Sequence, residues 1–180
     1  MKKFDLSIVG IVGIPARYGG FVTFAEHFVK WSSSILDIRV FCSSKEYSRS
    51  EQLKSYKGVD LEYIRVRANG ATSIIYDLIG LFTSMYTSRV ILVLGVSAGI
   101  FFPIVKLFSS SKLIVNIDGL EWRRSKWSSG TRIFLRISER IAVKFADEII
   151  VDNKVLSFYV KEVYKKDTHI IAYGGDHLVE

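Results

Sequence analysis

The sequence predicts a doubly wound α/β fold, in which helices cover both faces of a parallel sheet. Apolar runs of strand length recur along the chain, and helical patterns lie between most of them. The predicted strands are residues 6–12, 38–42, 61–66, 90–94, 113–117, 148–151 and 169–172. Strands that are apolar almost throughout are typical of parallel sheets buried on both sides. Because ligands of such sheets bind at the carboxyl ends of the strands, we expect the functional site there.

Side-chain periodicity predicts two of the helices. Phe21, Phe24, Ala25 and Phe28 fall at positions i, i+3, i+4 and i+7, which is one face of a helix that follows the first strand. Further along, an apolar residue recurs every four positions and a basic residue precedes each one. This pattern predicts a helix with a buried face and a solvent face. The buried face is Ile133, Ile137, Ile141 and Phe145, and the solvent face is Arg132, Arg136, Arg140 and Lys144.

Two segments carry membrane-like signals. Residues 90–108 are apolar and long enough for a spanning helix. The segment contains Gly95, Ser97, Gly99, Pro103 and Lys106. These residues favour a buried strand, a turn of small residues and then a helix. Residues 1–16 have basic residues before an apolar run, as a signal peptide does, but Asp5 interrupts the start and the run is better explained as the first strand.

Length and charge limit the possible functions. The 180 residues suit one domain with a sizeable core, and 49% hydrophobic and 24% charged residues are typical of a globular protein. The net charge of +7 indicates an anionic partner, which is a nucleic acid, a phosphorylated metabolite or an acidic membrane surface. The alternative is that the basic balance serves solubility alone.

Cysteine and histidine usage argues against a disulfide and a metal site. Cys42 is the only cysteine in the sequence, so no disulfide forms within the chain, which favours a reducing cytosol. His27, His169 and His177 lack the spacing of metal ligands, and no D-x-D motif is present. We therefore predict no metal.

The first predicted strand-to-helix turn lacks the common nucleotide motifs. It reads Gly10-Ile-Val-Gly13-Ile-Pro15, which is not the G-x-G-x-x-G spacing of dinucleotide-binding enzymes, and the P-loop pattern is absent. Gly19 and Gly20 stand at the start of the predicted helix, where backbone N–H groups and the helix dipole favour an anion. Arg17 could add a charged fork. The alternative is a Gly-Gly bend that only turns the chain.

A set of motifs across nearly the whole chain resembles a known enzyme family. The motifs are GIPARYGGF (13–21), RANGATS (67–73), LGVSAGIF (94–101), VNIDGLEWRRSKW (115–127), ERIAVKFAD (139–147), DNK (152–154) and IAYGGD (171–176). They resemble the family-4-like group of GT-B glycosyltransferases, and most closely bacterial polysaccharide rhamnosyltransferases. That group usually has Glu after G-G-F, where this chain has Val22.

The resemblance implies a Rossmann-like fold that is the N-terminal half of a GT-B enzyme. Residues 1–172 would form the acceptor-side domain, and residues 173–180 would begin the hinge to a C-terminal donor-binding domain absent from this chain. The implied reaction is retaining transfer of rhamnose from dTDP-rhamnose to a lipid-linked saccharide, without a further cofactor. The implied location is the inner face of the bacterial cytoplasmic membrane. On this interpretation the isolated chain has little or no activity.

The resemblance also implies roles for individual residues. Arg17, Tyr18, Gly19 and Gly20 would face the donor diphosphate. Asp118, at the end of the fifth long strand, and Glu121 are the catalytic candidates. An Asp-Gly turn is the alternative explanation of Asp118.

An acceptor or membrane surface is predicted from a cluster of aromatic and basic residues. Its members are Arg67, Asn69, Trp122, Arg123, Arg124 and Trp127. Such a mixture suits a membrane interface or a lipid-pyrophosphate headgroup, and no nucleic-acid-binding motif accompanies it. Three alternatives stay open: a partly buried Trp pair on a basic surface, a nucleotide- or phosphate-binding module without catalysis, and a membrane-embedded protein that uses residues 90–108.

Overall fold

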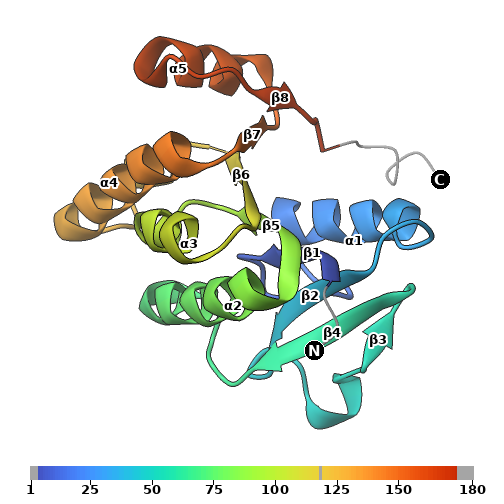
Figure 1. Cartoon of the computed structure of the whole chain (residues 1–180). Coiled ribbons are helices and arrows are strands. Elements are labelled where there is room, and N and C mark those ends of the chain that lie inside the picture. The colour runs from blue at the N-terminus through green and yellow to red at the C-terminus, as the bar shows by residue number, and fades with distance from the viewer. Residues whose placement is uncertain (1–3, 118, 174–180) are drawn as a thin grey trace.

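The computed structural model describes residues 4–117 and 119–173. In this part of the chain one sheet contains eight strands in the order β3-β4-β2-β1-β5-β6-β7-β8 (Figure 1). The strands are β1 (Phe4–Val9), β2 (Ile38–Ser43), β3 (Ser55–Tyr56), β4 (Val59–Ile64), β5 (Ser88–Leu94), β6 (Lys112–Ile117), β7 (Glu148–Val151) and β8 (His169–Ile170). All neighbouring pairs are parallel except the short β3–β4 hairpin. The α/β class predicted from the apolar runs is confirmed.

Five α-helices and four 3-10 turns connect the described strands. The helices are α1 (Gly20–Ser32), α2 (Ser73–Thr87), α3 (Phe102–Phe108), α4 (Ser129–Phe145) and α5 (Lys154–Tyr164). The 3-10 turns are η1 (Arg49–Glu51), η2 (Gly70–Thr72), η3 (Gly99–Phe101) and η4 (Glu121–Arg123). Residues 90–108 form the end of β5, a turn over residues 95–98, η3 and α3, as the strand–turn–helix interpretation expects. None of the described helices has both the length and the apolar character needed to cross a membrane.

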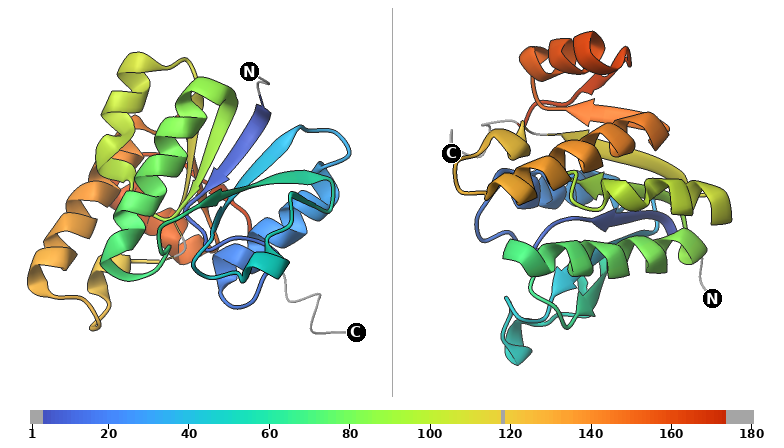
Figure 2. Two further views of the ribbon diagram at one scale, coloured as in Figure 1. Left: turned by 90° about the horizontal axis from the view of Figure 1, so that it is seen from below. Right: turned by 90° about the vertical axis from the view of Figure 1, so that its left-hand side faces the viewer.

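The helices are divided unequally between the two faces of the sheet. The apolar faces of α2, α3, α4 and α5 pack in one cluster with β-strand residues such as Val93 and Val115. On the other face α1 packs over β1 and β2, with Ile8 and Val40 in its cluster (Figure 2). Burial on both sides explains why the central strands are apolar almost throughout.

The prediction for the buried face of α4 is wrong at Ile133 and Ile137 but holds at Phe145, which is half-buried and packs against the core. Ile133 and Ile137 are 61% and 47% exposed. The buried residues of α4 are Leu135, Ser138, Glu139, Ala142 and Val143. Two of these are polar because the neighbouring elements supply hydrogen-bond partners for them, and a hydrophobic periodicity does not register such positions.

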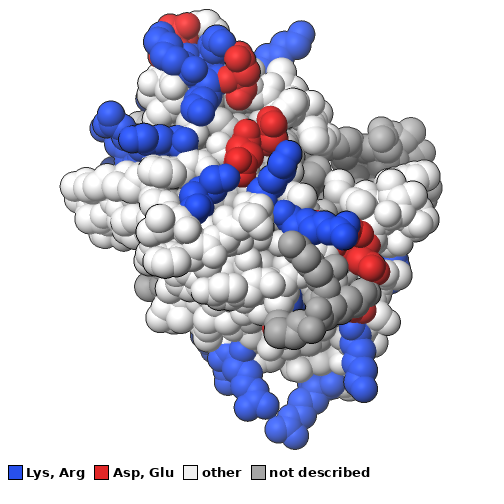
Figure 3. Space-filling model, in the orientation of Figure 1, with Lys and Arg blue, Asp and Glu red and all other residues white. Residues whose placement is uncertain are grey.

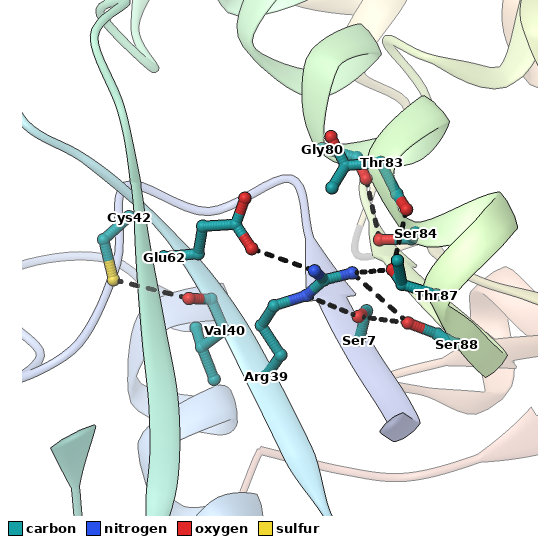
Figure 4. A network of polar contacts seen from close by, with 10 residues as sticks. All are labelled: Ser7, Arg39, Val40, Cys42, Glu62, Gly80, Thr83, Ser84, Thr87 and Ser88. Atoms are coloured by element: carbon teal, nitrogen blue, oxygen red, sulfur yellow. Dashed lines mark hydrogen bonds and ion pairs between the residues drawn. The ribbon is translucent and has the colours of Figure 1, made fainter. Parts of the chain in front are cut away.

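A buried arginine ties together the part of the sheet away from the carboxyl strand ends. Arg39 of β2 is 4% exposed, and its guanidinium donates to Glu62, Thr87, Ser88 and Ser7 (Figure 4). The distance from Nη1 to the Glu62 carboxylate is 2.9 Å. Burial lowers the pKa of Arg39, and the Glu62 carboxylate opposes that shift. One guanidinium thus joins β1, β2, β4, α2 and β5.

Candidate functional site

A cleft of about 530 Å³ opens at the carboxyl ends of the central strands. Gly10 follows β1, residues 95–97 follow β5, and Gly119 follows β6, and all of them line the cleft. Residues of α2 and of the first turns of α4 form its walls. This is the edge of a parallel sheet at which ligands bind, and it agrees with the position expected from the sequence.

Gly10 sets how closely the loop after β1 approaches β5. Its φ of +95° is in the region that favours glycine. A Cβ atom there would lie 2.3 Å from the carbonyl oxygen of Leu94. Any other residue would therefore push the two strand ends apart and deform the floor of the cleft.

The loop after β5 is fixed to α4 by a buried serine. The Ser138 hydroxyl donates to the carbonyl of Val96 at 2.5 Å and accepts from the N–H of Ile100 at 3.0 Å. Gly99 makes this contact possible, because a Cβ atom there would lie 2.5 Å from the Ser138 carbonyl oxygen. The backbone along the floor of the cleft is therefore held rigidly.

Asp77 of α2 is a buried acid that lines the cleft. It is 4% exposed, and its carboxylate accepts a hydrogen bond from the hydroxyl of Ser97. Burial raises the pKa of Asp77 to about 7, against the smaller opposing effect of the Ser97 hydrogen bond. Near neutral pH the group therefore exists in both forms, and its ionised form can accept a hydrogen bond from a ligand hydroxyl.

Asp77 was not among the residues predicted from the sequence. The signal that could have found it is an acid inside the apolar helical segment SIIYDLIGLF (73–82). An ionisable group on the buried side of a helix is expensive unless it is paired, and such groups are frequent at functional sites.

Glu121 lines the cleft, but its carboxylate is already fully engaged. It accepts from the Trp127 indole at 2.9 Å, from Arg124 at 2.8 Å, and pairs with Lys126 at 3.1 Å. Burial acts to raise the pKa of Glu121, but these three donors outweigh it and lower the pKa. The arrangement holds the segment after η4 in place with an ionised carboxylate. The other catalytic candidate, Asp118, lies outside the described residues.

The structure divides the predicted acceptor cluster between two cavities. Arg124 and Trp127 line the cleft, whereas Trp122 and Arg123 line a separate pocket behind η4. The backbone near Arg67 and Asn69 reaches the rim of the cleft, because Ala68 and Gly70 line it. The side chains of Arg67 and Asn69 are themselves exposed.

The predicted diphosphate loop lies at the amino end of α1. Gly19, with φ +116°, precedes the helix, and among the described residues no side chain caps the helix. A Cβ atom on Gly20 would lie 3.4 Å from the Tyr173 ring. Phe21, the next residue, lines the cleft. The uncapped helix start therefore adjoins the cleft through Phe21, while Gly19 and Gly20 are not among its lining residues.

Arg17 and Tyr18 point to different surroundings. The Arg17 guanidinium pairs with Glu51, donates to the Glu46 carbonyl at 2.8 Å, and lies 4.7 Å above the Tyr47 ring. Tyr18 is 94% exposed. In this structure Arg17 thus joins the loop to the η1 region and does not face the cleft.

Val22, where the resembled group has Glu, is a core residue. It is 5% exposed and packs in the apolar cluster between α1 and the sheet. A carboxylate at this position would be buried without a charged partner, which explains why an apolar side chain suits this chain.

Within the described residues, no group of three or more His, Cys, Asp or Glu side chains is arranged to hold a metal ion. Cys42 is a buried free thiol whose pKa burial raises to about 12. It is therefore an inert thiol at neutral pH.

Two solved structures of GT-B glycosyltransferases have the same Rossmann-like fold over part of their length. A sucrose-phosphate synthase from Thermosynechococcus elongatus matches 93% of this chain with a TM-score of 0.67 and 12% identity. Arabidopsis thaliana UGT89C1, solved in complex with UDP-L-rhamnose, matches 97% with a TM-score of 0.54 and 10% identity. The chain spans 47% and 52% of those two structures, which is about half of each.

Sequence comparison adds the family. No curated protein matches the chain by sequence. A family model described as "Domain of unknown function (DUF1972)" matches residues 3–176, which is nearly the whole chain. The chain therefore belongs to the DUF1972 family.

Proposed function

We propose that this chain is the acceptor-side domain of a retaining glycosyltransferase that uses a nucleotide-sugar donor. The observation that carries the proposal is the cleft at the carboxyl strand ends, which is lined both by the buried Asp77–Ser97 pair and by Phe21 in the first turn of the uncapped helix α1. A buried carboxyl group is suited to a sugar hydroxyl, and an uncapped helix start is suited to phosphate oxygens. A group suited to the acceptor hydroxyl and a group suited to the donor phosphate thus occur at the same edge of the sheet.

The proposed roles follow from this chemistry. Asp77, in its ionised form, accepts a hydrogen bond from the acceptor hydroxyl and orients its oxygen towards the sugar. The N–H groups at the start of α1, beside Gly19 and Gly20, stabilise the negative charge that grows on the leaving diphosphate. Glu121 holds the η4 segment, with Trp127, against the acceptor. A second domain of the complete protein would bind the rest of the donor.

The finer proposal is transfer of rhamnose from dTDP-rhamnose to a lipid-linked saccharide on the inner face of the cytoplasmic membrane, in polysaccharide assembly. The motif resemblance supports the rhamnose donor and the saccharide acceptor. A nucleotide-rhamnose ligand is also bound by UGT89C1, which has the same fold. The test is an assay of the complete gene product against a panel of nucleotide-sugars with membrane-extracted acceptors. Turnover with dTDP-rhamnose alone supports the finer proposal, and turnover with another donor supports only the general one.

Gly20→Val tests the role of the helix start. The added side chain would meet the Tyr173 ring and cover the N–H groups of α1, so we expect turnover to fall at least a hundredfold while the thermal midpoint changes little. Ser129→Val is the matched control, because Ser129 is the exposed first residue of α4 and does not line the cleft. Equal activity in the two variants would contradict the proposed diphosphate loop. Donor binding without any turnover by the unaltered protein would favour a binding module instead.

The pH dependence of turnover tests Asp77. Because the acceptor-binding form is ionised and the pKa is about 7, kcat/KM should rise between pH 6 and 8 and then level off. Asp77→Asn should lower kcat/KM and remove this rise. A variant that keeps both the rate and the rise would exclude Asp77 from the acceptor site.

A further inference from the structure

A second cavity, of about 510 Å³, lies between η4, α4 and α5. Figure 3 shows Lys and Arg side chains gathered over α4 and α5. Five basic side chains line the cavity: Arg123, Arg136, Arg140, Lys144 and Lys166. Among the described residues no carboxylate lines it. We call this cavity the basic pocket, and it shares no lining residue with the cleft.

The five cations of the basic pocket have no ion-pair partner in the part of the chain that the structure describes. None of them forms an ion pair with another described residue. Elsewhere in the described chain eight Lys or Arg side chains, from Arg17 to Lys161, pair with carboxylates. Ten further described cations also lack an ion pair, but the five of the basic pocket line one concave place, where their mutual repulsion favours a bound anion.

The floor of the basic pocket is rigid and partly aromatic. The guanidinium groups of Arg123 and Arg136 lie 5.0 Å and 5.1 Å from the centre of the Trp122 ring. The hydroxyls of Tyr159 and Tyr164 both donate to the fully buried Glu139 carboxylate, at 2.7 Å and 2.6 Å. The tyrosine hydroxyls are thereby engaged, and burial keeps both groups neutral by raising their pKa values. The binding donors of the pocket are then the guanidinium and ammonium groups.

This combination of side chains suits a phosphate-type anion. Arginine guanidinium groups donate in pairs to phosphate oxygens, and lysine ammonium groups add point charge. Two arginines held against one indole ring are oriented before the ligand arrives. A single carboxylate ligand would leave most of the five cations unpaired, whereas a pyrophosphate or phosphodiester group offers several charged oxygens.

We propose that the basic pocket is a binding site for a phosphate or pyrophosphate group, separate from the cleft. The group belongs either to a soluble phosphorylated molecule or to the headgroup of an anionic lipid. The exposed Ile133 and Ile137 stand on the same outer face of α4 as Arg136 and Arg140, so a headgroup in the pocket would place these isoleucines beside its acyl region. The site needs only the charges of this chain and does not rest on the proposed transferase function.

The experiment compares two charge-matched variants of the full chain. The pocket variant carries Arg136→Gln, Arg140→Gln and Lys144→Gln. The control variant carries Lys45→Gln, Arg49→Gln and Lys54→Gln, three exposed residues in no ion pair among the described residues. Both lose three positive charges, so a general electrostatic effect lowers binding equally in the two. Circular dichroism and thermal melting check that both variants are folded.

Two probes distinguish the sources of the anion. Titration with inorganic pyrophosphate measures binding of a soluble ligand. Co-sedimentation with vesicles of 30% phosphatidylglycerol in phosphatidylcholine measures binding to an anionic lipid surface. Since each Lys or Arg near an anionic surface strengthens vesicle binding about fivefold, the pocket variant should bind vesicles about a hundredfold more weakly. For pyrophosphate, the loss of charge-assisted hydrogen bonds should weaken binding at least about tenfold.

Each outcome decides the proposal. Weaker binding of either probe by the pocket variant, with the control close to the unaltered chain, supports the site and identifies its source. Equal losses in the two variants, or no binding of either probe by the unaltered chain, overturn the proposal. Because neither probe requires turnover, the site can fail while the transferase proposal succeeds, and the reverse.

Discussion

Asp77 places a carboxyl group in the interior beside the cleft, and its protonation links stability to pH. Its pKa rises from an ordinary value near 3.8 to about 7 in the folded protein. The folded state therefore binds more protons than the unfolded state between about pH 4 and pH 7. The contribution of Asp77 to the free energy of unfolding is therefore largest below about pH 4. It falls as the pH rises from about 4 to 7 and is constant above that range. The acid thus makes the folded protein less stable at the pH at which its ionised form is present.

Asp77→Asn should therefore stabilise the protein at pH 8 and leave it nearly unchanged at pH 4. The gain at pH 8 is up to about 4 kcal/mol, at about 1.4 kcal/mol per pKa unit. Urea unfolding at the two pH values measures the difference. A gain of the same size at both pH values would show that the Asp77 carboxyl is not the titrating group.

Residue by residue, the site was only partly predictable. Glu121, chosen for its place after a strand end, lines the cleft, whereas the predicted Gly19 and Gly20 do not, and the roles of all three stay predictions. The engagement of Arg17 by Glu51 could not be predicted, since it joins loops that are 34 residues apart. Asp77 was missed because its significance comes from Ser97, which belongs to another element.

At the scale of elements, the strands followed directly from their apolar runs, with shifts of a few residues at their ends. The two-residue strand β3 and the inward face of α4 could not be predicted from such runs. Ser138 is completely buried in α4, where it bonds to Val96 and Ile100. Glu139 is also completely buried, and its Oε1 atom accepts hydrogen bonds from Tyr159 and Tyr164. These partners come from other elements and cannot be read from the sequence of α4. The four-residue repeat of isoleucines therefore predicted the wrong buried positions.

Two substitutions on α4 measure which face is inside. Leu135 is 5% exposed, so Leu135→Ala should lower the free energy of unfolding by about 2–5 kcal/mol, because a cavity forms in the core. Ile137→Lys, at a position 47% exposed, should change the free energy of unfolding by less than about 1 kcal/mol. Guanidinium unfolding of the two variants gives the comparison. A larger loss of stability in the Ile137 variant than in the Leu135 variant would mean that the face predicted from periodicity is the buried one.

For the whole molecule, the Arg39 network adds polar contacts between four strands of the sheet and α2. Its guanidinium lies between the Phe4 and Phe41 rings, at 4.7 Å and 4.6 Å from their centres, and donates to three hydroxyls and one carboxylate. A buried arginine in strand IRVFCS would have been placed on an exposed edge by composition alone. The residues around Arg39 come from four other elements that are far from it in the sequence, so its burial could not be predicted from the local pattern.

Arg39→Lys should therefore destabilise the protein by about 2 kcal/mol or more, because an ammonium group cannot replace the planar fork and leaves buried hydroxyls without a donor. Arg89→Lys is the matched control, since Arg89 forms an exposed pair with Asp5 at 2.9 Å and should change stability by less than about 0.5 kcal/mol. Denaturant midpoints compare the two, and equal midpoints would mean that the network contributes nothing beyond burial.

The strand order also has a consequence for how the chain is made. β1 emerges first, yet it lies in the middle of the sheet and pairs with β5, with Phe4 opposite Ser88. During synthesis the edge of β1 that later faces β5 thus stays unpaired until about half of the chain has left the ribosome. An open strand edge is a template for aggregation, and pairing over such a separation in sequence folds slowly. Chaperone occupancy should accordingly be highest on nascent chains in which Ser88–Leu94 has not yet left the ribosome, and it should fall once β5 can close the centre of the sheet.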